Sequence, residues 1–144
     1  MKITIDRLKH SLAVANKMKE IVENESNKYS FDSDAAFVLG LLHDIGYAFS
    51  NNPNEHAIIG GKILKEQGYK YWKEVFYHGV LQFEYQSLEL NLLNYVDLMT
   101  SPTGEYITIQ ERIEDISKRY GKNSFQENEA KKLFENLKKE FLNN

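Results

Sequence analysis

The chain of 144 residues has no cysteine, only two prolines and no excess of basic residues. The lack of cysteine excludes disulfides, thiolate metal sites and a cysteine nucleophile. Lys and Arg number 18 and Asp and Glu 21, so the net charge of −3 excludes a basic surface for bulk nucleic acid and argues against an anionic membrane partner. No apolar run approaches the roughly 18 residues of a membrane span, and the first residues lack a signal-peptide core, so we expect a cytoplasmic protein.

Apolar residues recur at helical spacing along almost the whole chain. The pattern predicts one all-α domain over residues 1–144, built as a bundle of about seven helices. The expected helices cover about 6–25, 34–45, 53–68, 70–78, 88–99, 109–120 and 124–142. No internal repeat or long linker divides the chain into further domains.

Individual residues predict where some of these helices begin and end and which faces they pack. Gly46 is expected to end the second helix, and Asn52-Pro53 to begin the third. Leu8 and Leu12 lie on the apolar arc by which the first helix would face the core. Gly60-Gly61 lacks the strand and spacing of a dinucleotide-binding motif, and it predicts close helix packing instead.

Six ionisable side chains fall on inward-facing positions of the expected helices. Apolar residues surround His43 and Asp44 on every side of their helix, which is typical of a buried helix. Asp97 likewise lies among leucines and a valine. A buried imidazole or carboxylate is costly unless it is paired, hydrogen-bonded or bound to a metal. The other inward-facing residues of this kind are His10, His56 and His78.

Taken singly, each of these histidines is more often a hydrogen-bonded core residue than a ligand. Asp97 alone could equally form an ion pair with a basic residue. Taken together, neutral imidazoles and carboxylates suit the same divalent ions, and no cysteine competes with them. The set therefore indicates a metal site at the centre of the bundle.

The order and surroundings of these residues resemble the HD superfamily of metal-dependent phosphohydrolases. Residues 10–15 (HSLAVA) resemble its first-helix signature, and residues 41–46 (LLHDIG) its name-giving doublet. Residues 56–61 (HAIIGG) resemble its following helix, and residues 96–99 (VDLM) its closing aspartate. The resemblance spans about residues 7–100, which would form the motif-bearing core on which the helices over 109–142 pack.

The resemblance implies a set of metal ligands. The residues that match the ligands of a first divalent metal are His10, His43, Asp44 and Asp97. His56 and His78 match the extra histidines of members that hold two metals, with Asp44 as the bridge. This donor set fits iron, manganese, cobalt, nickel or zinc.

The reaction implied by the resemblance is hydrolysis of a small phosphate ester or anhydride, a nucleotide above all, by a metal-activated water. His43 and Asp44 would be the catalytic residues, with Asp97 as a ligand. The metals would supply the positive charge with which an acidic protein binds a phosphorylated substrate. Two alternatives stay open: a metal-holding module that binds a nucleotide or a protein without catalysis, and a structural protein whose histidines are core residues.

One position departs from the pattern of this superfamily. Many catalytic relatives carry a lysine after His-Asp-x-Gly, where it helps to bind phosphate, and here that position is Tyr47. A tyrosine donates one hydrogen bond but brings no charge. Arg7, one turn before His10 and about 60° round the helix, could reach the site instead or be a solvated surface residue. The aromatic residues over 69–77 fit either a nucleobase pocket or the core, and the loop over 83–86 could frame the site.

Overall fold

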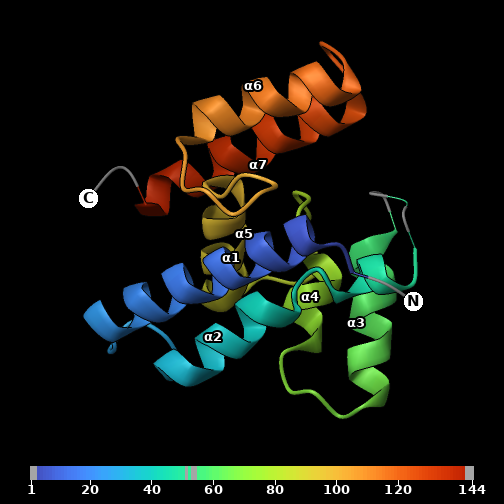
Figure 1. Ribbon diagram of the computed structural model, residues 1–144. Coiled ribbons are helices and arrows are strands. Elements are labelled where there is room, and N and C mark those ends of the chain that lie inside the picture. The colour runs from blue at the N-terminus through green and yellow to red at the C-terminus, as the bar shows by residue number, and fades with distance from the viewer. Residues whose placement is uncertain (1–2, 51, 53–54, 142–144) are drawn as a thin grey trace.

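The computed structural model describes residues 3–50, 52 and 55–141, and these residues form seven α-helices and one 3₁₀ helix with no β-strand (Figure 1). The predicted all-α class is confirmed. The helices are α1 (Ile5–Asn24), α2 (Ser33–Leu42), η1 (Ile45–Ala48), α3 (His56–Glu66), α4 (Trp72–Tyr77), α5 (Leu88–Leu98), α6 (Ile109–Tyr120) and α7 (Phe125–Phe141). Within the described part of the chain, no helix combines the length and the apolar character needed to traverse a bilayer.

Helices α1 to α5, with η1, form one unit that we call the body. Its core joins residues of α1, α2, α4 and α5, among them Met18, Leu39, Val75 and Leu92, all of which are fully buried. Helices α1 and α2 approach closely because residue 40 is glycine: a Cβ there would lie 2.6 Å from Cα of Ala15. The backbones of α1 and α2 are therefore in contact near the C-terminal end of α2.

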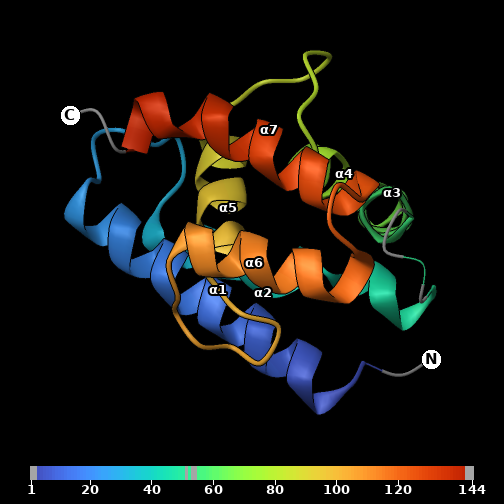
Figure 2. The same ribbon diagram turned by 90° about the horizontal axis from the view of Figure 1, so that it is seen from above.

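Helices α6 and α7 form an antiparallel pair that we call the hairpin. Figure 1 shows it as a separate layer above α1 to α4, with α5 running between the two layers, and Figure 2 shows the same pair from above. The hairpin has a hydrophobic cluster of its own, which includes Ile113 and Leu137 and reaches the body through Leu98 of α5. The ring of Tyr95 also stacks on that of Phe141, with 4.1 Å between centroids. The hairpin is thus joined to the body mainly through α5.

The turn after α2 differs from the sequence-based expectation. Helix α2 ends at Leu42, and the chain continues through a turn into η1, so Gly46 lies inside a second helix and does not end the first one. Glycine is needed there because a Cβ at residue 46 would lie 1.8 Å from the carbonyl oxygen of His56. This contact holds η1 against the start of α3. Of the expected Asn52-Pro53 start, Pro53 lies outside the described residues, and α3 begins at His56.

Two expectations about burial are wrong. Helix α2 is not buried on all sides, because the side chains of Val38 and Leu41 are 41% and 40% exposed. Leu8 and Leu12 are also exposed, at 50% and 47%. Both helices lie at the surface of the body, so only one face of each contacts the core. The prediction of close packing at Gly60-Gly61 is confirmed, since a Cβ at residue 61 would lie 2.7 Å from Cα of Phe76.

Candidate metal centre

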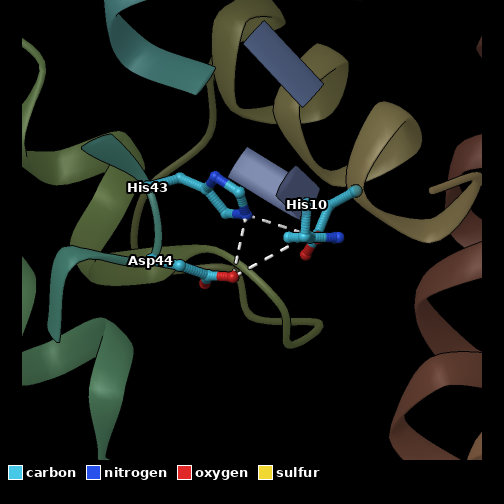
Figure 3. A group of neighbouring side chains, drawn as sticks. His10, His43 and Asp44 are labelled. Carbon is cyan, nitrogen blue, oxygen red and sulfur yellow. Dashed lines mark hydrogen bonds and ion pairs between the residues drawn. The ribbon is translucent and has the colours of Figure 1, made fainter. Parts of the chain in front are cut away.

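The structure brings all six predicted residues together in the body. They form two overlapping groups, within each of which the candidate ligand atoms lie within 4.8 Å of one another. The first group is His10, His43, Asp44 and Asp97, and the second is Asp44, His56 and His78. Figure 3 shows His10 of α1 meeting His43 and Asp44, which follow α2 directly. Each group could hold a metal ion, and Asp44 belongs to both.

Backbone carbonyls orient three of the four imidazoles. Nδ1 of His10 donates to the carbonyl oxygen of Ser101 over 2.8 Å. Nδ1 of His43 donates to Gly40, and Nδ1 of His78 to Val75, each over 2.6 Å. A carbonyl oxygen only accepts, so the proton lies on Nδ1 and a neutral ring keeps the lone pair of Nε2 free for a ligand bond. These hydrogen bonds are of the kind that fix metal-binding histidines.

The Nε2 atoms of the first group point at carboxylate oxygens. Nε2 of His10 lies 2.8 Å from Oδ1 of Asp97, and Nε2 of His43 lies 3.3 Å from Oδ2 of Asp44. The His43 side chain is 0% exposed, and its Nε2 makes no hydrogen bond within the described residues. A buried polar atom without a hydrogen bond is costly, and a metal ion would satisfy it. The residues of this group therefore fit a metal.

The two oxygens of Asp44 face different groups. Oδ2 faces His10 and His43, at 3.6 and 3.3 Å from their Nε2 atoms. Oδ1 faces the second group, 3.2 Å from Nε2 of His56 and 3.3 Å from Nε2 of His78. This is the arrangement expected of a carboxylate placed between two cations.

Electrostatic contacts within the centre outweigh the effect of burial. Burial lowers the pKa of His43, but the carboxylates of Asp44 and Asp97 raise it well above the ordinary histidine value. Burial raises the pKa of Asp44, yet contacts with histidines, His43 first, hold it well below its usual range. The pKa of Asp97 is lowered against burial in the same way by His10 and His43. The two carboxylates thus favour positive charge at this point, and a metal would compete there with the protons of the histidines.

The centre opens into a cavity of about 430 Å³, which Arg7 and Tyr47 also line. The guanidinium of Arg7 lies 3.4 Å from the centroid of the Tyr47 ring. That ring stacks in turn on His56, with 4.2 Å between centroids and 10° between planes. Burial and the charge of Asp44 raise the pKa of Tyr47 to about 12, so its hydroxyl keeps its proton at neutral pH. Arg7 therefore faces the site and is not a solvated surface residue.

Other aromatic residues have structural roles. Tyr69, Tyr71 and Trp72 pack against the core of the body. Of the two roles that the sequence allowed for them, a nucleobase pocket or the core, the structure supports the core. The loop over 83–86 does not line the cavity, although Gly79 and Val80 just before it do.

Sequence reasoning missed the contribution of the hairpin to this cavity. Arg112, Ile116 and Arg119 of α6 line it, together with Phe125 and Leu133 of α7. The spacing of 112, 116 and 119 places those three residues on one helical face, which is the only signal that the sequence contains for them.

A comparison with protein-family models matches residues 7–120 to the HD domain. The match begins in the first turn of α1, runs to the end of α6 and includes all six residues of the candidate metal centre. Neither the curated proteins nor the solved structures contain a match to this chain.

Proposed function

The chain belongs to the HD-domain family, and from this premise we propose that it is a phosphohydrolase that cleaves a small phosphate ester or anhydride, in particular a nucleotide. The observation that carries the proposal is the pair of ligand groups that share Asp44. We propose that the groups hold one or two divalent transition metal ions, drawn from iron, manganese, cobalt, nickel and zinc. The six side chains would be the ligands.

When bound, such ions lower the pKa of a water molecule and neutralise phosphoryl charge. The chain's own residues would prepare the site for that chemistry. The Nδ1 hydrogen bonds of His10, His43 and His78 present each Nε2 toward the centre without a change of rotamer. Asp44 and His43 would act as catalytic residues through the metal: Asp44 lines the cavity, and Nε2 of the buried His43 lies 3.3 Å from its Oδ2.

Arg7 and Tyr47 would bind the phosphate at the place where many relatives have lysine. Arg7 supplies the positive charge, and its position over the Tyr47 ring restricts the guanidinium. The stack of Tyr47 on His56 ties this pair to the second ligand group. The phenol would add one neutral hydrogen-bond donor.

The absence of lysine also supports a second candidate function. A tyrosine at residue 47 brings no charge to a reacting phosphoryl group, which suits a module that holds metal and binds a nucleotide or a protein without cleaving it. In that case Arg7 and the centre would serve recognition alone.

The test combines metal analysis with a substrate screen. Purified protein should contain a transition metal, and after loading with Mn²⁺, Fe²⁺ or Co²⁺ it should hydrolyse members of a panel of phosphomonoesters, cyclic nucleotides and dinucleoside polyphosphates. Asp44→Asn should abolish the turnover, whereas Asp34→Asn, which changes a carboxylate that is 86% exposed, should leave it unchanged. Binding of nucleotides without turnover under any metal would favour the non-catalytic module. Absence of tightly bound metal, with no loss of stability in His43→Ala, would contradict the metal centre.

A further inference from the structure

All three arginines of the chain line the cavity of the metal centre. They are Arg7 of α1 and Arg112 and Arg119 of α6. The chain's other 15 basic residues are lysines, and none of those in the described ranges lines this cavity. Arginine presents a planar set of donors that matches phosphate oxygens, whereas lysine acts as a point charge. The distribution of the two residue types therefore indicates that the cavity recognises phosphate at more than one place.

Arg112 is held with unused hydrogen-bonding capacity. Its side chain is 18% exposed, and its Nε is buried with no hydrogen-bond partner in the described part of the chain. Its nearest acid is Asp115, one turn along α6, whose Oδ2 lies 3.8 Å from Nη1 of Arg112. A buried guanidinium N–H that no protein group satisfies is a donor for a ligand.

Arg119 extends this positive charge along α6. Its Nε lies 3.0 Å from the same Oδ2 of Asp115, so one carboxylate faces two guanidinium groups. That oxygen accepts no hydrogen bond within the described residues, which means that the contacts with Arg112 and Arg119 are ion pairs without hydrogen-bond geometry. Arg112, Arg119 and Asp115 together carry one net positive charge. Glu129 of α7 also lines the cavity, and its carboxylate lies 3.8 Å from Nζ of Lys132.

Apolar side chains lie along the same cavity. Ile116 of α6 follows Arg112 by one turn, and Phe125 and Leu133 of α7 line the cavity as well. A volume of about 430 Å³ falls within the range of roughly 300–1,000 Å³ that small-molecule sites occupy. The cavity thus combines a metal centre, an apolar surface and a pair of arginines contributed by the hairpin.

We propose that Arg112 and Arg119 form a subsite for a second, non-reacting phosphate group. The inference rests on the proposed function, since it places the reacting phosphate at the metal centre beside Arg7. The substrate would then be a bisphosphorylated small molecule, whose organic part contacts Ile116, Phe125 and Leu133. The hairpin would select this substrate, and the body would hydrolyse it.

The test is a binding comparison between matched compounds. Protein loaded with Mn²⁺ is titrated by calorimetry with pairs of compounds that share one organic group and carry either one phosphate or two, in nucleoside and in alkyl series. The bisphosphate should bind roughly tenfold to a hundredfold more tightly than the monophosphate, as expected for charge-assisted hydrogen bonds. Arg112→Gln should remove most of this preference while the affinity for the monophosphate stays the same.

Two further variants keep the test decisive. Arg119→Gln changes a side chain that is 53% exposed, so it tests the subsite even if Arg112→Gln fails to fold. Lys118→Gln removes a neighbouring charge of α6 that does not line the cavity, and it should change neither affinity. Equal binding of both members of every pair, or an equal loss for both in the arginine variants, would overturn the subsite.

The result also separates the subsite from the proposed function. Preferential binding of bisphosphates without turnover would contradict the phosphohydrolase and leave the subsite standing. Turnover of monophosphates with no preference for bisphosphates, and no effect of Arg112→Gln, would contradict the subsite and leave the phosphohydrolase standing.

Discussion

The body and the hairpin contribute different kinds of residue to one cavity. All six candidate metal ligands come from the body, and two of the three arginines come from the hairpin. Backbone carbonyls orient three of these ligands, and one of the three, His43, is 0% exposed. Arg119, in contrast, is 53% exposed, and among the described residues its ion pair is with Asp115 of its own helix. The comparison indicates that the reaction centre is fixed within one core, while the groups that would select the substrate lie on a separately packed pair of helices.

The largest effect should follow from removal of the residue that both ligand groups share. Asp44→Asn removes the negative charge that both groups share and replaces one of its two oxygens with NH₂, so bound metal should be lost and turnover should fall by at least roughly a hundredfold, since even outer-shell changes cost about 10–100-fold. Metal content by mass spectrometry and initial rates measure the two effects. Full metal content with normal rates would contradict the central role of this carboxylate.

A pair of core substitutions tests whether the two regions are separate. Leu92→Ala in the body and Leu137→Ala in the hairpin each remove a fully buried side chain, and each should lower the free energy of unfolding by about 2–5 kcal/mol. Metal affinity should fall in Leu92→Ala only, because Leu92 lies in the core of the body and on α5, the helix that carries Asp97. Chemical denaturation and metal titration measure the two quantities. Equal loss of metal in both variants would show that the hairpin also supports the centre.

Gly46→Ala tests the contact that joins the two ligand groups inside the body. A Cβ at this position would meet the backbone of His56 at 1.8 Å, so η1 and α3 must move apart. Overpacking of this kind costs about 1–3 kcal/mol of stability. The shift should weaken metal binding at His56 and His78 more than at the group around His10. A metal titration that resolves two binding steps would detect this, and two unchanged steps would contradict it.

The grouping of the six candidate ligands was predictable from sequence because each is a polar side chain within an apolar helical pattern, although His43, Asp44 and His78 lie just beyond the ends of their helices. His43 and Asp44 could be assigned this way even though α2 is less buried than its composition suggests. The roles of Gly46 and Arg112 depend on contacts between segments far apart or across a cavity, which helical periodicity does not describe. Periodicity also placed Leu8 on the apolar arc without showing that half of it stays exposed.

The smallest effect concerns the turn of the hairpin and depends on pH. Hydrogen bonds from Lys131, and next from Ser117, lower the pKa of Glu127 from 4.5 to about 2. A carboxylate whose pKa is lower in the folded state stabilises the fold above its unfolded pKa, and this contribution disappears as the pH falls from about 4.5 to about 2. Glu127→Gln should therefore lower Tm at neutral pH, and its difference from the wild type should shrink across that window. Glu135→Gln on the same helix, which changes an exposed carboxylate, is the matched control.

Metal content should stay unchanged in both variants, because each substitution acts on the hairpin and leaves the body intact. Loss of metal in Glu127→Gln would instead show that the turn of the hairpin supports the metal centre.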